Sequence, residues 1–203
     1  MDLKSTYNKI AEHWDKDHEK DTWWIHGTDK FISLLKPGSL VLDVGCGSGQ
    51  KAEYLVNHGL KIVGTDFSEK MIELAKQRVP NADFFVHDLY EIKNLPYDFD
   101  AIYANAVLLH VPKKDVTPVI RGFISKIKPG GYLYIKVKQI KPGQKEERME
   151  KENDYGLDYE RFFSYFTLEE IIGYLKNLGL KIYYHDIELT GRIYWILVIA
   201  EKI

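Results

Sequence analysis

The sequence predicts a single α/β domain built on a doubly wound, mostly parallel sheet of seven strands. Short β-branched runs alternate with longer amphipathic stretches through the middle of the chain. Such alternation requires a parallel sheet with helices on both faces. Near the end, two strand-like runs are joined by only Glu188–Gly191. Because so short a connection cannot be a parallel crossover, we expect six parallel strands and one reversed strand.

The elements follow from periodicity and from capping residues. Strands are expected at residues 39–44, 61–65, 83–86, 99–104, 132–137, 181–187 and 192–199, and helices at 50–58, 69–78, 115–127 and 168–178. Ser68 and Thr167 are the expected N-caps of two of these helices, because their hydroxyls accept hydrogen bonds from free first-turn amides. Pro118 has to sit in the first turn of its helix, where its missing amide is harmless. Gly179 should end the last helix.

Two segments lie outside this alternation. The N-terminal stretch is helical in pattern and rich in large aromatic residues. Residues 138–166 form a connection of nearly thirty residues, and connections of that length are usually functional lids or disordered inserts. Its charged run Lys145–Glu152 is expected to be a mobile, hydrated helix. We therefore describe residues 1–203 as one domain with a helical cap at 1–36 and a lid-like insertion at 138–166.

Composition excludes several classes of protein. Apolar residues make up 45% of 203 residues, which is enough for one sizeable core without disulfides or metal. Twenty-eight basic and thirty acidic residues give a net charge of −2, which argues against binding nucleic acid through the overall field. Cys46 is the single cysteine and allows neither a disulfide framework nor a cysteine-rich zinc site. No apolar leader or membrane-length run is present, so a soluble, cytoplasmic protein is expected.

The most informative motif is a glycine-rich loop at Val41–Gly49. A strand ends, three alternate glycines follow, and a helix begins. Glycine there permits a sharp turn and lets a ligand approach the backbone closely. Several nucleotide-binding folds use such a loop, and a tight turn without a ligand is the alternative.

Three successive strands end in an acid at the carboxyl edge of the sheet, where open α/β sheets bind ligands: Asp43, Asp66 and Asp88. Each alone is as well explained by a helix cap or a solvated turn. Together they favour a nucleoside, with Asp66 accepting from a ribose and Asp88 from an adenine amino group. Asp43 would repel a phosphate and suits ammonium or sulfonium character. The Gly-x-Gly-x-Gly spacing also differs from that of dinucleotide and triphosphate sites, so a cationic adenosine derivative fits better than NAD or ATP.

At these motifs the chain resembles the class I S-adenosylmethionine-dependent methyltransferases, from about Leu40 to Ile203. The motifs are Val41–Gly49, Val63–Ser68 with Met71, Val86–Leu89, Phe99–Asn105 and Lys128–Gly131, and the N-terminal Tyr7–Trp14 segment resembles the small-molecule branch. The resemblance implies a Rossmann-like sheet in the order 3-2-1-4-5-7-6, with strand seven antiparallel.

The resemblance also implies a site for S-adenosyl-L-methionine. Its expected residues are Asp43, Gly45, Cys46, Gly47, Gly49, Asp66, Phe67, Met71, His87, Asp88, Leu89 and Asn105. Asp43 and the glycine loop would face the methionine part, Asp66 the ribose, and Asp88 the adenine. Phe67 and Leu89 are equally explained as core residues. Cys46 is assigned no nucleophilic role.

Methyl transfer from a sulfonium is an in-line displacement, so the protein mainly aligns the reactants and excludes water. A base is needed only for a protonated acceptor. His110 is the candidate, because an ordinary imidazole pKa near 6.5 suits proton removal. A structural histidine is the alternative, and His26 is a weaker candidate. No metal motif is present, so no metal is expected.

The acceptor is expected to be a small molecule. Asn105–Leu108 departs from the signature of amino methyltransferases that act on nucleic-acid bases, which makes nucleic acid an unlikely partner. The aromatic N-terminal segment and the insertion would form the acceptor pocket, where Lys136, Lys138 and Arg161 could bind an acidic acceptor. A solvated surface position is the alternative for lysines near strand ends. Alternatives are an RNA, DNA or protein methyltransferase, an NAD(P)-dependent oxidoreductase, and a non-catalytic adaptor. The acceptor, the methylated atom and the oligomeric state stay open.

Overall fold

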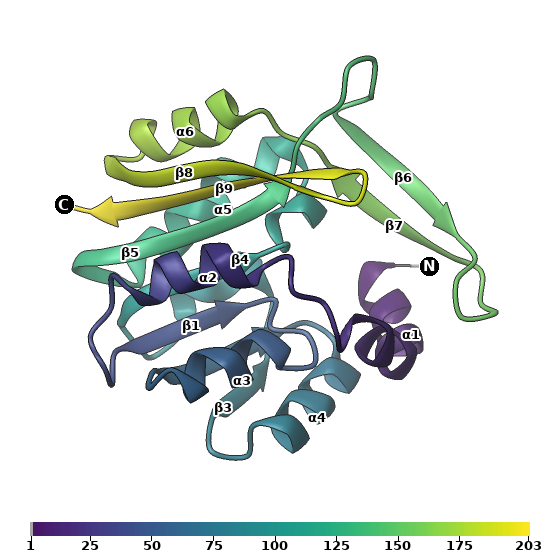
Figure 1. The fold of residues 1–203 in the computed structure, drawn as a ribbon, viewed down its shortest axis with the longest axis horizontal. Coiled ribbons are helices and arrows are strands. Elements are labelled where there is room, and N and C mark those ends of the chain that lie inside the picture. The colour runs from purple at the N-terminus through teal and green to yellow at the C-terminus, as the bar shows by residue number, and fades with distance from the viewer. Residues whose placement is uncertain (1) are drawn as a thin grey trace.

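The computed structural model, which describes residues 2–203, contains a seven-stranded sheet in the order β3-β2-β1-β4-β5-β9-β8 (Figure 1). Its strands are β1 (Leu40–Val44), β2 (Lys61–Asp66), β3 (Asp83–Val86), β4 (Phe99–Asn105), β5 (Ile127–Lys138), β8 (Leu180–Thr190) and β9 (Ile193–Lys202). β9 is antiparallel to both of its neighbours, and the other pairs are parallel. The predicted fold class, the order 3-2-1-4-5-7-6 and the single reversed strand are therefore confirmed.

Helices cover both faces of this sheet, and each face has its own buried apolar layer (Figure 1). The helices are α1 (Leu3–His18), α2 (Ile25–Ile32), α3 (Gln50–Asn57), α4 (Glu69–Arg78), α5 (Lys113–Ser125) and α6 (Leu168–Asn177), with 3₁₀ turns at η1 (Leu89–Asn94) and η2 (Leu108–His110). Residues of α2, α3 and α4 contribute to one layer, and residues of α5 and α6 to the other. None of the helices within residues 2–203 combines the length and apolar character needed to cross a bilayer.

Both predicted N-caps form. The Ser68 hydroxyl accepts from the Met71 amide at 3.2 Å and starts α4. Thr167 starts α6 with a reciprocal capping box, in which its hydroxyl accepts from the Glu170 amide at 3.1 Å and the Glu170 carboxylate accepts from the Thr167 amide at 2.8 Å. Local chemistry therefore fixes these two helix starts.

The predicted place of Pro118 is wrong. The helix begins at Lys113, two residues earlier than expected, so Pro118 lies inside α5 and not in its first turn. A proline in a helix interior leaves the carbonyl four residues earlier without its usual amide donor. That carbonyl belongs to Lys114, and both residues are exposed, so water can replace the missing donor.

The charged run Lys145–Glu152, predicted to be a mobile helix, forms a strand instead. β6 (Glu147–Glu152) pairs antiparallel with β7 (Tyr159–Ser164), and this hairpin extends from one end of the sheet beside α1 (Figure 1). The Arg148 guanidinium donates to Glu150 at 3.0 and 2.7 Å, two residues along one face of β6. Residues two apart lie on the same face of a strand, so this ion pair supports the strand conformation. The high charge of the segment had led to the prediction of a hydrated helix. The division into cap, domain and lid-like insertion stays a prediction.

We predict that Gly27→Ala destabilises the protein. A Cβ at this position of α2 would lie 2.6 Å from Cδ2 of Leu197, which is fully buried in the sheet. Such overpacking costs about 1–3 kcal/mol of unfolding free energy, measurable by urea denaturation. Gly173 on α6 is the matched control, because a Cβ there has no atom within 4 Å. Gly173→Ala should be neutral or stabilising by about 0.5–1 kcal/mol, and equal effects of both changes would contradict the packing of α2.

Candidate functional site

A cavity of about 550 Å³ lies at the carboxyl edge of the sheet. The ends of β1, β2, β4 and β5 supply Asp43, Asp66, Asn105 and Lys138 to its wall, and the start of β9 supplies Trp195. Side chains of α1 and of the β6–β7 hairpin also line it. This volume lies in the range of small-molecule sites.

The glycine loop bends around one wall of the cavity. Gly45 and Gly47 have positive φ angles of 66° and 54°, which residues with a Cβ rarely adopt. A Cβ on Gly45 would lie 2.6 Å from Cγ2 of Val107. The Asp66 carboxylate fixes the loop by accepting from the Gly47 amide at 3.0 Å and the Ser68 amide at 2.9 Å. The loop thus presents backbone to the cavity without side-chain obstruction.

Asp43 and Asp66 are both buried beside this loop. Asp43 is 2% exposed, and no described group lies within hydrogen-bond distance of its Oδ2. Burial raises the pKa of Asp43 to about 7 and that of Asp66 to about 6, in the second case against the lowering effect of the two amides. An orphaned buried acceptor requires a partner, and a cationic donor group supplies the strongest one.

Lys51 stands close to the Asp43 carboxylate. Its ammonium lies over the rings of Trp14, Trp23 and Trp24, with 5.6, 6.0 and 5.7 Å to the ring centroids. Burial lowers its pKa, although Asp43 opposes that effect. Among the described residues no carboxylate oxygen comes within 4.0 Å of Nζ, and the side chain lines the cavity. Lys51 therefore has hydrogen-bond donors left for an anionic group of a ligand.

His110 lies in a hydrogen-bonded chain across the cavity roof. Its Nδ1 donates to the Phe162 carbonyl at 2.7 Å, so Nε2 accepts from the Tyr7 hydroxyl at 2.9 Å. That hydroxyl in turn accepts from Nη1 of Arg161 at 3.1 Å. Burial lowers the pKa of His110 to about 3. The premise of an ordinary pKa near 6.5 is wrong, and whether His110 ever takes a proton stays untested.

The structure brings most of the predicted residues together. The ones that line the cavity are Asp43, Gly45, Cys46, Gly47, Asp66, Phe67, Met71, Asn105 and His110. The Cys46 thiol is buried, and burial with two nearby aspartates raises its pKa, which agrees with a packing role. Asn105 is 8% exposed and accepts from the Tyr134 hydroxyl at 3.4 Å.

Gly49, His87, Asp88 and Leu89 do not line the cavity. Gly49 is the N-cap of α3, with a φ of 83°. Asp88 is exposed and caps η1 by accepting from the Tyr90 amide at 3.0 Å, which is the capping alternative raised for each acid. The cofactor contacts expected of these four residues, with Asp88 and Leu89 at the adenine and Gly49 at the methionine part, stay predictions.

Sequence reasoning missed several lining residues. They are His18, Asp21, Lys51, Ala106, Val107, Leu109, Thr190, Ile193 and Trp195. Trp14 belongs to the aromatic N-terminal segment and Glu150, Glu152 and Phe163 to the insertion, the two segments expected to form the acceptor pocket. Lys51 directly follows the glycine loop, and that proximity was an available signal. No pattern in the sequence pointed to Glu150 and Glu152 individually, because their position at the cavity depends on the β6–β7 hairpin.

The three cations expected to bind an acidic acceptor have different environments. Lys136 is fully buried and forms an ion pair with Glu188, so it does not face the cavity. Arg161 is held by two bonds of 2.5 Å to the Glu152 carboxylate. Lys138 lines the cavity and makes no ion pair among the described residues. The prediction for Lys136 is therefore wrong, because its ammonium is buried and already paired with Glu188.

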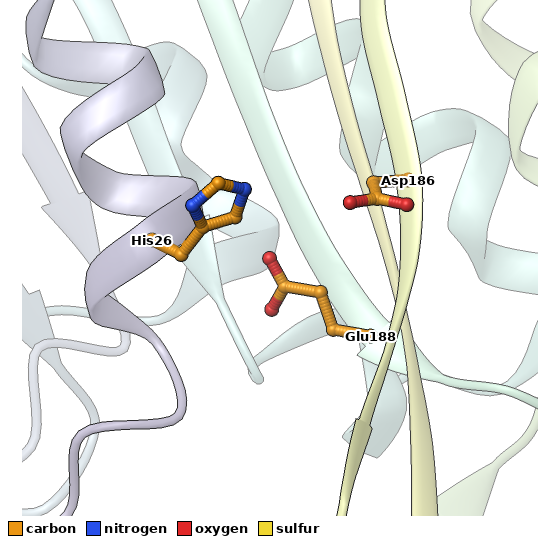
Figure 2. A group of neighbouring side chains, drawn as sticks. All are labelled: His26, Asp186 and Glu188. Carbon is orange, nitrogen blue, oxygen red and sulfur yellow. The ribbon is translucent and has the colours of Figure 1, made fainter.

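Among the described residues, one group of side chains has the spacing of a metal site. Figure 2 shows His26 on α2 facing Asp186 and Glu188 on β8, with one potential ligand atom of each within 4.8 Å of the others. Oε1 of Glu188 is buried without a hydrogen-bond partner, but Oε2 pairs with the Lys136 ammonium. That ammonium would repel a divalent cation bound at Glu188. We therefore assign no metal to this group.

Comparisons with known proteins agree with this geometry. The methyltransferase domain family model matches residues 17–185. A ubiquinone biosynthesis O-methyltransferase of Coxiella burnetii is 33% identical over 135 residues, covering 58% of this chain and 57% of the relative. A phosphoethanolamine N-methyltransferase of Triticum aestivum is 30% identical over 178 residues, covering 84% of this chain and 30% of the relative. The chain thus spans about half, or less, of these curated relatives.

A solved structure of similar fold is the 1,6-didemethyltoxoflavin-N1-methyltransferase of Burkholderia thailandensis. It aligns with a TM-score of 0.76 and 16% identity, covering 98% of this chain and 87% of the other. At that identity the likeness concerns the fold. The family model carries the assignment, and it confirms the prediction of a methyltransferase. The chain belongs to the methyltransferase domain family.

Proposed function

We propose that this chain transfers a methyl group from S-adenosyl-L-methionine to a small-molecule acceptor by in-line displacement. The observation that carries the proposal is the buried, unpartnered Oδ2 of Asp43 beside the open glycine loop. A nicotinamide dinucleotide would bring a pyrophosphate against that carboxylate, so the oxidoreductase alternative fits less well. A cytoplasmic location is part of this proposal.

The chain's own residues divide the work of holding the donor. Asp43 suits the ammonium of the methionine part, and Lys51 suits its carboxylate. Asp66, already engaged with two amides, keeps acceptor capacity for ribose hydroxyls. When bound, the donor supplies an activated methyl group on a sulfonium with a good leaving group. The fit is chemical: a buried acid, a half-buried ammonium and loop backbone that lines the cavity match the charges of that molecule.

The roof favours a small acceptor. Tyr7 of α1 and Arg161 of β7 meet above the cavity, and the hairpin adds Glu152 and Phe163 to the wall. The relatives named above are an O- and an N-methyltransferase, so they leave the methylated atom open. We infer that His110 positions the Tyr7 hydroxyl, since both ring nitrogens are engaged. Tyr7 would then orient the acceptor.

The direct test of the proposed function uses isotopically labelled S-adenosyl-L-methionine. Purified protein is incubated with fractionated metabolite pools, and the label is followed by mass spectrometry. We expect one class of small molecule to gain the label. Transfer only to RNA, DNA or protein, or a thermal shift with NAD and none with S-adenosylhomocysteine, would contradict the proposal.

The affinity for S-adenosylhomocysteine should fall as the pH falls. With a pKa of about 7, Asp43 is ionised at pH 8 and largely protonated at pH 6, so its attraction for an ammonium is lost on acidification. Between pH 8 and pH 6 the ionised fraction of Asp43 falls about tenfold, so the affinity should fall about tenfold. Calorimetry at the two pH values measures this change. Asp43→Asn should bind weakly at both values. A flat profile in the wild-type protein would show that Asp43 does not meet the ammonium.

Tyr7→Phe and His110→Ala should each slow turnover by about tenfold or more, because both break the chain that orients the acceptor. Donor binding should change little. Their effects on kcat should not add, since the two residues act as one unit. At saturating donor, wild-type kcat should show no inflection near pH 6.5. A falling acid limb there that disappears in His110→Ala would instead make His110 the base.

A further inference from the structure

We propose that Lys138 forms an anion-binding subsite, so that the acceptor carries a carboxylate or phosphate group beside a flat apolar body. This inference rests on the proposed function, because it names the class of molecule that enters the same cavity. The subsite is separate from the proposed donor site, because different elements carry the two. Lys138 is the last residue of β5, whereas Asp43 lies in β1 and Lys51 lies in the first turn of α3, after the glycine loop.

Near the hairpin, two ion pairs involve the charged side chains that line the cavity. The Arg161 guanidinium makes two bonds of 2.5 Å to Glu152 and a third to the Tyr7 hydroxyl. Glu150 accepts from Arg148 at 3.0 and 2.7 Å and from the Tyr165 hydroxyl. These contacts leave neither pair available for a ligand charge.

Two lysines line the cavity, Lys51 and Lys138, and for neither does a carboxylate oxygen among residues 2–203 lie within 4.0 Å of Nζ. Lys51 stands at the donor end, where Asp43 and Asp21 are its charged neighbours. Lys138 lies beside the hairpin: its Nζ lies 4.0 Å from the ring centroid of Phe163, whose ring is 4.8 Å from that of His110. A donor held at the glycine loop therefore accounts for Lys51 and not for Lys138.

A half-buried ammonium without a counter-charge is unfavourable unless a ligand supplies one. The aromatic face of Phe163 offsets part of this loss but provides no hydrogen-bond acceptor. Burial lowers the pKa of Lys138 to about 8, in spite of Glu150 and Glu152 farther away. An anionic oxygen group bound at Nζ would restore the charge balance and fill the free donors.

The apolar part of the acceptor is indicated by the wall next to Lys138. Trp195 is directly opposite Lys138 in the β5–β9 pairing, and its side chain lines the same cavity. Trp23 stacks on Trp195, with ring centroids 4.2 Å apart and an interplanar angle of 10°. A planar aromatic body can pack along such a wall, as offset stacking between rings is favourable. Lys138 and the tryptophan wall together therefore predict an acceptor that carries an anionic group on a planar aromatic body.

The test uses probes of matched shape and different charge. Wild-type protein saturated with S-adenosylhomocysteine is titrated with benzoate, phenyl phosphate and the neutral benzamide, and binding is followed by ligand-observed NMR. We expect at least one anion to bind tenfold or more tightly than benzamide. The anion that binds better distinguishes a carboxylate subsite from a phosphate subsite. Equal binding of the amide, or no binding of either anion, would overturn the proposal.

Variants assign the effect to the residue. Lys138→Met keeps the apolar stem and should reduce anion affinity to the level of benzamide, while Lys138→Arg should restore much of it. Lys141→Met, a change at an exposed lysine just beyond β5, is the control and should have no effect. Unchanged anion binding in a folded Lys138→Met would exclude the subsite. Failure of S-adenosylhomocysteine to bind the wild-type protein, with anions still selected through Lys138, would refute the proposed donor and not this inference.

Discussion

Two carboxylates buried at the carboxyl edge of a parallel sheet are the constraint on which the rest of the site depends. Asp66 is tolerated there because it accepts from the Gly47 and Ser68 amides, and in doing so it shapes the glycine loop and the start of α4. Asp43 has no such partner at Oδ2. Burial raises its pKa in spite of the nearby Lys51 ammonium, so the free protein holds a poorly solvated acid that a cationic ligand would stabilise. A site of this kind is built for its ligand at some expense to the unliganded fold.

The roof over these carboxylates depends on contacts between distant parts of the chain. The Tyr7 hydroxyl on α1 joins His110, which follows β4, to Arg161 on β7. Glu152 on the neighbouring strand then holds Arg161 in place. The N-terminal helix and the hairpin are thereby coupled through a few polar atoms. Such a roof can select the acceptor without altering the donor site, since the two are carried by different elements.

Most patterns of short range were read correctly from the sequence, although the start of α5 before Pro118 was not. Alternating strands and helices gave the sheet, the four-residue connection gave the reversed strand, and Ser68 and Thr167 gave helix starts. Each signal is contained within a few residues and reflects backbone geometry or a local hydrogen bond. The hairpin strand β6 was missed because its two-residue periodicity is carried by charged side chains, whose partners lie on β7 and in β6 itself.

The sequence by itself determined the sheet, the glycine loop and the placing of Asp43 and Asp66 beside it, because strand ends and loop conformation follow from local residue types. Only the tertiary structure decided the state of the charged groups. Lys136, Lys138 and Arg161 are equivalent basic residues in the sequence. In the structure Lys136 is buried in an ion pair with Glu188, Arg161 is paired with Glu152, and Lys138 lines the cavity without an ion pair. The same holds for the lowered pKa of His110. Desolvation and pairing are properties of the neighbours that folding brings together, and local pattern does not contain them.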